Sequence, residues 1–217
     1  MGLDYSYKLF FKHAHLWDAL EAAAILARPN PDEQTIIEYP DRELVLPFGQ
    51  YPEKKSRISH EDSMHRRMFS MSLYFEFDEA VRQYVNEWRE DVRKMKDYEE
   101  WEPPIDAQGR VAIGCIYLTI YRDLNIYSHK DYDPNLTMLK FTAATTDMSL
   151  LFEKSTSIRD TFTLLLMLNQ GEYGLLDREN DAVIIWWRGQ AMSKVIADSW
   201  LSQREIESIV GAPKVSL

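Results

Sequence analysis

Hydrophobic and polar residues alternate at the start of the chain and then change to a helical spacing. Residues 5–11 place an apolar side chain at every second position, which is the pattern of a half-buried strand. Residues 16–27 place apolar side chains on one helical face, and two prolines follow. Two short strand patterns, at 35–39 and 42–48, come next. Residues 1–50 therefore predict the order strand, helix, strand, strand.

The same order returns in residues 66–146. An alternating run at 69–77 predicts a strand, and Asp78 is a suitable N-cap for the helical pattern behind it. Residues 111–121 and 136–145 then predict two further strands.

A third unit is predicted in residues 147–190. Residues 148–154 are interpreted as its opening strand, and the stretch Ser157 to Asp160 resembles a capping box at the start of a helix. A hairpin follows, with its turn at 179–181. The tail, 191–217, predicts one helix near 192–201 and a last helix that begins at a capping box formed by Ser202 and Glu205.

The repeated order of strand, helix, strand and strand predicts the fold class. We expect an α+β protein of three successive strand–helix–strand–strand units, with a mainly antiparallel sheet, helices packed on one face and a C-terminal helical tail. We expect the whole chain, 1–217, to form a single globular domain.

Composition and charge narrow the function classes. The chain has 217 residues with a net charge of −10, and this acidity disfavours nucleic acid as a partner because phosphate backbones are repelled. No apolar run reaches the length of a membrane span, so no membrane association is expected. A single cysteine, Cys115, excludes an intrachain disulfide, which favours a cytoplasmic location. Cys115 lies in an apolar strand pattern, where we expect it to be buried.

Motifs for nucleophilic catalysis and for nucleotide cofactors are absent. The sequence contains no G-x-S-x-G element and no glycine-rich phosphate loop, and the eight glycines are scattered. We therefore assign no catalytic residue and expect no cofactor.

An acidic segment with embedded aromatic residues is the candidate partner-binding site. Residues 86–106 carry eight acidic and four basic residues. Tyr98, Glu99, Glu100 and Trp101 lie within it, and aromatic residues amid charge are typical of interface anchors. These four residues predict a protein partner with a basic surface. The alternative is a helix end whose aromatic side chains fold back onto the core.

A second candidate is locally basic. Arg57, Arg66 and Arg67 lie in the connection between the first two units, and arginines can hold a phosphate or carboxylate group. The alternative interpretation is a solvated, charged linker.

The histidines form the third candidate. His13, His60, His65 and His129 lie in predicted turns and loops beside carboxylates, a residue set that can ligate a metal ion. Their spacing matches no H-E-x-x-H motif, so the ligands would have to converge from separate loops. His13 also lies at the first strand-to-helix joint, where a polar side chain has a structural use.

Taken together, the sequence predicts a soluble, non-catalytic protein that binds another protein. An inhibitor or immunity-type protein for a basic partner is one concrete form. Two alternatives stay open: a metal-dependent hydrolase that uses the loop histidines and carboxylates, and a small-molecule binder on an aromatic sheet face.

Overall fold

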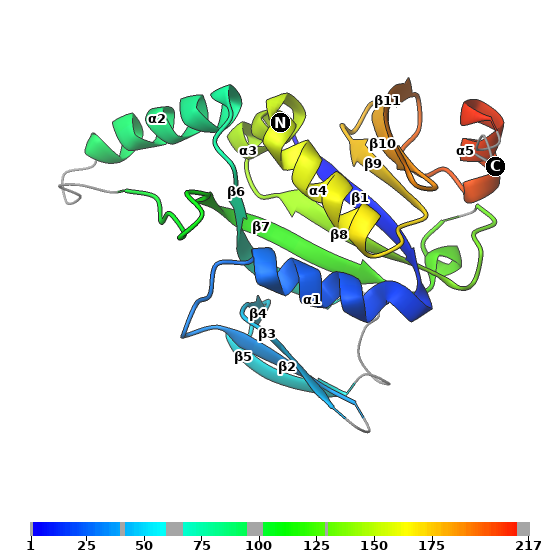
Figure 1. Ribbon diagram of the computed structural model, residues 1–217, viewed down its shortest axis with the longest axis horizontal. Coiled ribbons are helices and arrows are strands. Elements are labelled where there is room, and N and C mark those ends of the chain that lie inside the picture. The colour runs from blue at the N-terminus through cyan, green and yellow to red at the C-terminus, as the bar shows by residue number, and fades with distance from the viewer. Residues whose placement is uncertain (1, 40–41, 60–66, 95–101, 129, 212–217) are drawn as a thin grey trace.

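The predicted α+β class with a mainly antiparallel sheet is confirmed. A computed structural model describes residues 2–39, 42–59, 67–94, 102–128 and 130–211. These residues form five α-helices and eleven strands, and all but one of the strand pairings are antiparallel. The protein therefore has an α+β fold (Figure 1).

One large antiparallel sheet takes strands from every predicted unit. From one edge to the other its strands are β11 (Gln190–Ile196), β10 (Ala182–Trp187), β9 (Tyr173–Asp177), β1 (Ser6–Lys12), β8 (Leu136–Ala143), β7 (Val111–Tyr121), β6 (Arg67–Phe75) and β4 (Gly49–Gln50). The first strand of the chain, β1, thus lies inside the sheet, between β9 and β8. Strands from all three predicted units therefore meet in this sheet, although the strands predicted at 35–39 and 42–48 lie outside it.

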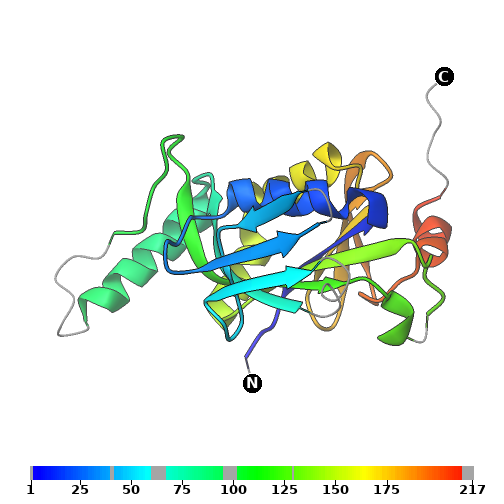
Figure 2. The ribbon, with the colours of Figure 1, turned by 90° about the horizontal axis from the view of Figure 1, so that it is seen from below.

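A second, smaller sheet lies beside the first (Figure 2). Its order is β3 (Glu43–Leu46), β2 (Gln34–Glu38) and β5 (Lys55–Ser59), with β2 parallel to β5. Ile37, Leu46 and Ile58 turn from these strands into the main core, so burial of their side chains joins the two sheets.

Helices α1 (Leu16–Leu26), α3 (Thr146–Lys154) and α4 (Thr156–Leu168) cover one face of the large sheet (Figure 1). A short 3₁₀ turn, η1 (His13–His15), leads into α1. The inner face of α4 consists of four buried residues, Ile158, Phe162, Leu165 and Leu166. Helix α2 (Glu79–Arg93) differs from these three, because much of its length extends past the end of the sheet (Figures 1 and 2).

The opposite face of the sheet is covered only in part. The last helix, α5 (Gln203–Val210), and the 3₁₀ turn η2 (Leu124–Ile126) lie over the β8–β1–β9–β10 region. Phe10, Tyr173 and Trp187 form the floor of this second core, and Ile206 of α5 packs onto it. Alternate residues of the strands therefore supply two separate cores.

A buried lysine fixes the chain that crosses this second face. Lys8 of β1 is fully buried, and its Nζ lies 2.7 Å from a carboxylate oxygen of Asp177 on β9. The same ammonium donates to Ser199 at 3.0 Å and lies over the ring of Trp200. Burial lowers the pKa of Lys8, and the Asp177 carboxylate opposes that shift. The pair anchors the segment that leads to α5.

Residues 148–154 are a helix, so the prediction of a strand there is wrong. Thr145 caps α3 by accepting a hydrogen bond from the Met148 amide. Met148, Leu151 and Phe152 are buried, which is helical spacing. A short apolar run fits both the strand period and the helix period, and here the Thr145 cap favours the helix.

Two further predictions near the C-terminal half are wrong. Helix α4 is capped by Ser155, which accepts from the Ile158 amide, and not by a capping box at Ser157. Residues 190–196 form the edge strand β11 instead of a helix. Arg188 and Gly189 both have positive φ, as a two-residue hairpin turn requires, and this turn folds β11 back onto β10.

Several local predictions are confirmed. Strand β7 spans the predicted residues 111–121, Asp78 caps α2, and Ser202 and Glu205 form the capping box of α5.

The prediction that Cys115 is buried is wrong, because its side chain is exposed. Cys115 lies at φ 59° where the pairing of β6 with β7 shifts register, and this bulge takes it out of the strand alternation. No helix in the described residues is long and apolar enough to cross a membrane.

Helix α4 approaches the following turn so closely that only glycine fits there. A Cβ on Gly171 would lie 2.4 Å from Leu166 Cδ2 and 2.9 Å from Leu166 Cβ. We expect Gly171→Ala to lower the free energy of unfolding by about 2 kcal/mol, because the buried leucine has no space to move. Urea denaturation measures this. Gly114→Ala is the control, because its methyl group would meet only the Ser72 hydroxyl, and an equal loss in both variants would contradict the explanation.

Candidate functional site

One carboxylate holds two helix N-termini together on the helical face. Asp78 follows β6, and its Oδ1 accepts from the Val81 amide at 2.8 Å, which caps α2. Its Oδ2 accepts from the Ser157 amide at 2.9 Å and from the Ser155 hydroxyl at 2.8 Å, in the first turn of α4. We call Asp78, Ser155 and Ser157 the Asp78 junction. It fixes where α2 leaves the sheet relative to α4.

The junction also sets the charge state of Asp78. Burial by itself would raise the pKa of this carboxyl, but the hydrogen bonds from Ser157, Val81, Ser155 and Thr156 together lower it. The carboxylate is therefore ionised at neutral pH, and its negative charge faces the N-terminal ends of two helices.

An apolar groove lies on one side of the junction, between α1 and α4. It has a volume of about 590 Å³. Ala22, Ile25 and Leu26 of α1 form one wall, and a stripe of α4 forms the other: Ser157, Asp160, Thr161, Leu164 and Leu168. Glu76, Asp78 and Arg110 lie around the rim and floor. Ile25 is 72% exposed and Leu168 is 66% exposed, so apolar surface faces solvent here.

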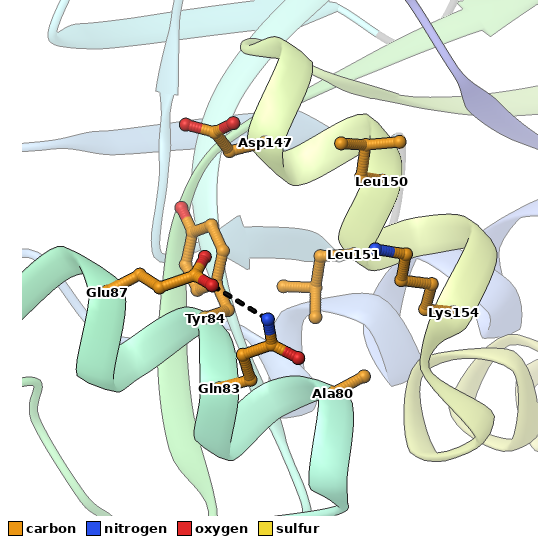
Figure 3. A pocket seen from close by; sticks show the side chains of 8 residues that line it. All are labelled: Ala80, Gln83, Tyr84, Glu87, Asp147, Leu150, Leu151 and Lys154. Carbon is orange, nitrogen blue, oxygen red and sulfur yellow. Dashed lines mark hydrogen bonds between the residues drawn. The ribbon is translucent and has the colours of Figure 1, made fainter.

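An acidic cleft lies on the other side of the junction, between α2 and α3. Figure 3 shows Glu87 of α2 and Asp147 of α3 on opposite sides of the gap, with Tyr84 between them. The hollow has a volume of about 210 Å³ and is also lined by Gln83, Leu151 and Lys154. It continues along α2 into a second hollow lined by Trp88, Glu90 and Asp91.

Negative charge dominates this cleft. Glu87 accepts from the Gln83 side chain, and Asp91 pairs with Lys94. Glu90 and Asp147 form no ion pair with any residue that the structure describes. Burial, with the neighbouring Cys115 and Asp147, raises the pKa of Tyr84 to about 12, so Tyr84 stays a neutral hydroxyl. The cleft is thus suited to a cationic side chain.

The predicted partner-binding residues lie next to this cleft in the sequence. Tyr98, Glu99, Glu100 and Trp101 fall outside the described residues. The segment that contains them begins directly after Lys94, the C-cap of α2. Glu102 resumes the described chain and pairs with Arg89 of α2.

The three predicted anion-binding arginines differ in their surroundings, and one of them lies outside the described residues. Arg57 lies on β5 and already contacts two carboxylates, with Nη1 2.6 Å from Glu43 Oε1 and a second contact to Glu38. Arg67 begins β6, opposite Ile120 of β7, and is half-buried. Arg66 lies outside the described residues. A new anion would therefore have to displace two glutamates from Arg57.

Of the four predicted metal-ligating histidines, only His13 is described. Its Nδ1 lies 2.6 Å from Thr137 Oγ1, and its amide donates to the Asn135 carbonyl. Burial first, and Arg122 second, lowers the pKa of His13. These contacts are those of a structural joint between β1 and β8. His60, His65 and His129 lie outside the described residues, and the described residues contain no cluster of three or more metal-ligating side chains.

The aromatic side chains do not gather on one open sheet face. Tyr7 and Trp186 are buried under the helices, and Trp187 is buried in the second core. Tyr117 is half-buried and packs edge-on against Tyr51.

Neither the apolar groove nor the acidic cleft was predicted from the sequence. The signal for the apolar groove was present, because Leu164, Leu168 and Met167 broaden the apolar surface of α4 beyond the face it buries. The α3 side of the acidic cleft had no local signal, because Asp147 lies between two segments, 136–145 and 148–154, that were interpreted as strands. Its approach to Glu87 depends on the packing of α3 against α2.

Comparison with known proteins adds no relative: no family model, curated protein or solved structure matches this chain.

Replacing Asp78 tests the junction. We expect Asp78→Ala to lower the free energy of unfolding by about 2 kcal/mol at neutral pH, because two helices lose a cap. The folded-state pKa is lowered, so this stability is present above the unfolded pKa and is lost as pH falls through the folded pKa. The difference in the free energy of unfolding from the parent protein should therefore be constant near neutral pH and narrow as pH falls below about 4.

Urea denaturation across this pH range measures the effect. Asp32→Ala, at an exposed loop carboxylate, is the matched control and should cost little at any pH. A gap between Asp78→Ala and the parent that stays constant down to the lowest pH would contradict the role given to the carboxylate.

Proposed function

We propose that this chain is a non-catalytic binding protein that engages a protein partner with a basic surface through the acidic cleft. The observation that carries the proposal is that Glu87 of α2 and Asp147 of α3 line the same cleft. An arginine or lysine of the partner would pair with these carboxylates.

The form of α2 supports this use. The helix extends beyond the sheet, and only Val81, Val85 and Val92 are buried along its length (Figure 1). A helix that contributes little to the core leaves its other faces available to a partner. The acidic segment with Tyr98 and Trp101 follows α2 directly in the sequence.

The overall charge supports the same partner. A net charge of −10 attracts a basic protein over a distance of about 10 Å at moderate salt, before any contact forms. An inhibitor or immunity-type protein that covers a basic toxin or nuclease would use a surface of this kind. No contact among the described residues favours the metal-dependent hydrolase or the small-molecule binder over this function.

A short oligoarginine peptide tests the cleft. We expect its addition to ¹⁵N-labelled protein to shift amide resonances of α2 and of the first turn of α3. An oligoglutamate peptide of the same length should shift none of them. The double variant Glu87→Gln/Asp147→Asn should weaken the oligoarginine affinity roughly tenfold, because it removes two charged contacts.

The matched control is Asp32→Asn/Glu53→Gln, which removes the same charge from exposed positions near the small sheet. It should change the affinity much less than the cleft variant. If both double variants weaken binding equally, the peptide responds only to net charge and the assignment to the cleft is wrong.

A further inference from the structure

The apolar groove between α1 and α4 is a second surface with a different chemistry from the acidic cleft. Among the described residues ten large apolar side chains are exposed, and three of them line this groove: Ile25, Leu164 and Leu168. Exposed apolar side chains that line a hollow together, unlike scattered ones, mark a binding surface.

We propose that this groove binds an amphipathic helix of a protein partner, with basic residues at one end of that helix. The proposal goes beyond the acidic cleft, because it concerns another surface and another driving force. It rests on the shape of the groove walls and on the charge at one end.

The walls suit a helix. On α4, Thr161, Leu164 and Leu168 follow the i, i+3, i+7 spacing of one helical stripe. On α1, Ala22, Ile25 and Leu26 follow i, i+3, i+4. The two stripes face the same hollow, and a third helix can pack its own apolar side chains between two such walls. Ala22 and Thr161 are small, which leaves space for larger side chains from the occupant.

The charge at one end of the groove selects the occupant. Glu76 and Asp160 are exposed there and form no ion pair with any described residue. The one cation of the lining, Arg110, is held by Asp106, with Nε 2.7 Å from Oδ2. The free charge at this end is therefore negative, and a lysine or arginine of the occupant would pair with it.

The same charge disfavours two other occupants. A second copy of this chain carries its own net charge of −10 and would bring more carboxylates to the interface. A fatty acid would place its carboxylate near Glu76 and Asp160, or expose it at the apolar end.

The probe is a fluorescein-labelled amphipathic peptide of about four helical turns, with leucines at i, i+3, i+4 and i+7 and two lysines at one end. We expect saturable binding by fluorescence anisotropy. A second peptide with glutamates in place of the lysines should bind more weakly.

Two variants test the walls. Ile25→Gln/Leu168→Gln should weaken binding roughly tenfold or more, because both side chains enter the contact. Both positions are exposed, so circular dichroism and the thermal midpoint should stay close to those of the parent. The matched control is Ile126→Gln/Val195→Gln, because these side chains are 66% and 61% exposed and lie far from the groove in the fold. This control should bind as the parent does.

A charge reversal tests the end of the groove. Glu76→Lys/Asp160→Lys should reverse the preference, so that the glutamate peptide binds more tightly than the lysine peptide. The cleft variant Glu87→Gln/Asp147→Asn should leave binding of the lysine peptide unchanged. The proposals for the cleft and for the groove are therefore tested independently.

Several outcomes would overturn the proposal. Equal weakening in the wall variant and its control would show that the peptide binds elsewhere. An unchanged peptide preference after the charge reversal would remove the argument for a basic occupant. A dimer in sedimentation experiments that only the wall variant dissociates would assign the groove to a second copy. Fatty-acid binding lost in the wall variant, without peptide binding, would assign it to a lipid.

Discussion

The carboxylate of Asp78 is the interaction on which the helical face depends. Two helix N-termini meet there, and each leaves backbone amides that need an acceptor. A carboxylate has two oxygens, and here each serves a different helix. The angle between α2 and α4 follows from this shared cap, and the Ser157 hydroxyl adds a hydrogen bond to the Glu76 carbonyl at the end of β6. The apolar groove and the acidic cleft lie on the two sides of this junction, so both proposed surfaces depend on it.

The two faces of the large sheet serve different purposes. On the helical face the core is continuous with the small sheet, and the hollows open between helices. On the opposite face a smaller aromatic core is covered by α5 and by the chain before it, which Lys8 and Asp177 anchor. A buried ion pair contributes more to specificity of position than to stability, because desolvation offsets much of the attraction. The ion pair joins β1, the first strand of the chain, to the much later strand β9, which suits a role in positioning.

The parts of the fold that local chemistry specifies could be predicted. Strand β7, the Asp78 cap of α2 and the capping box at Ser202 each follow from a few adjacent residues. The errors fall where a short pattern has two solutions. Residues 148–154 are apolar at both the strand and the helix period, and the cap at Thr145 favours the helix. Strand β11 has an exposed, weakly apolar pattern, and its identity depends on the Arg188–Gly189 turn and on the free edge of β10.

The sequence by itself determined the α+β class, the excess of negative charge and the ends of most elements, because periodicity, net charge and capping act over a few residues. It also indicated that the region around α2 is acidic and aromatic. The tertiary structure alone decided that β1 lies between β9 and β8, that Asp78 caps α4 as well as α2, and that Glu87 and Asp147 line one cleft. These features join residues that are far apart in the chain. Their positions follow from how whole helices pack on the sheet, and no local pattern carries that information.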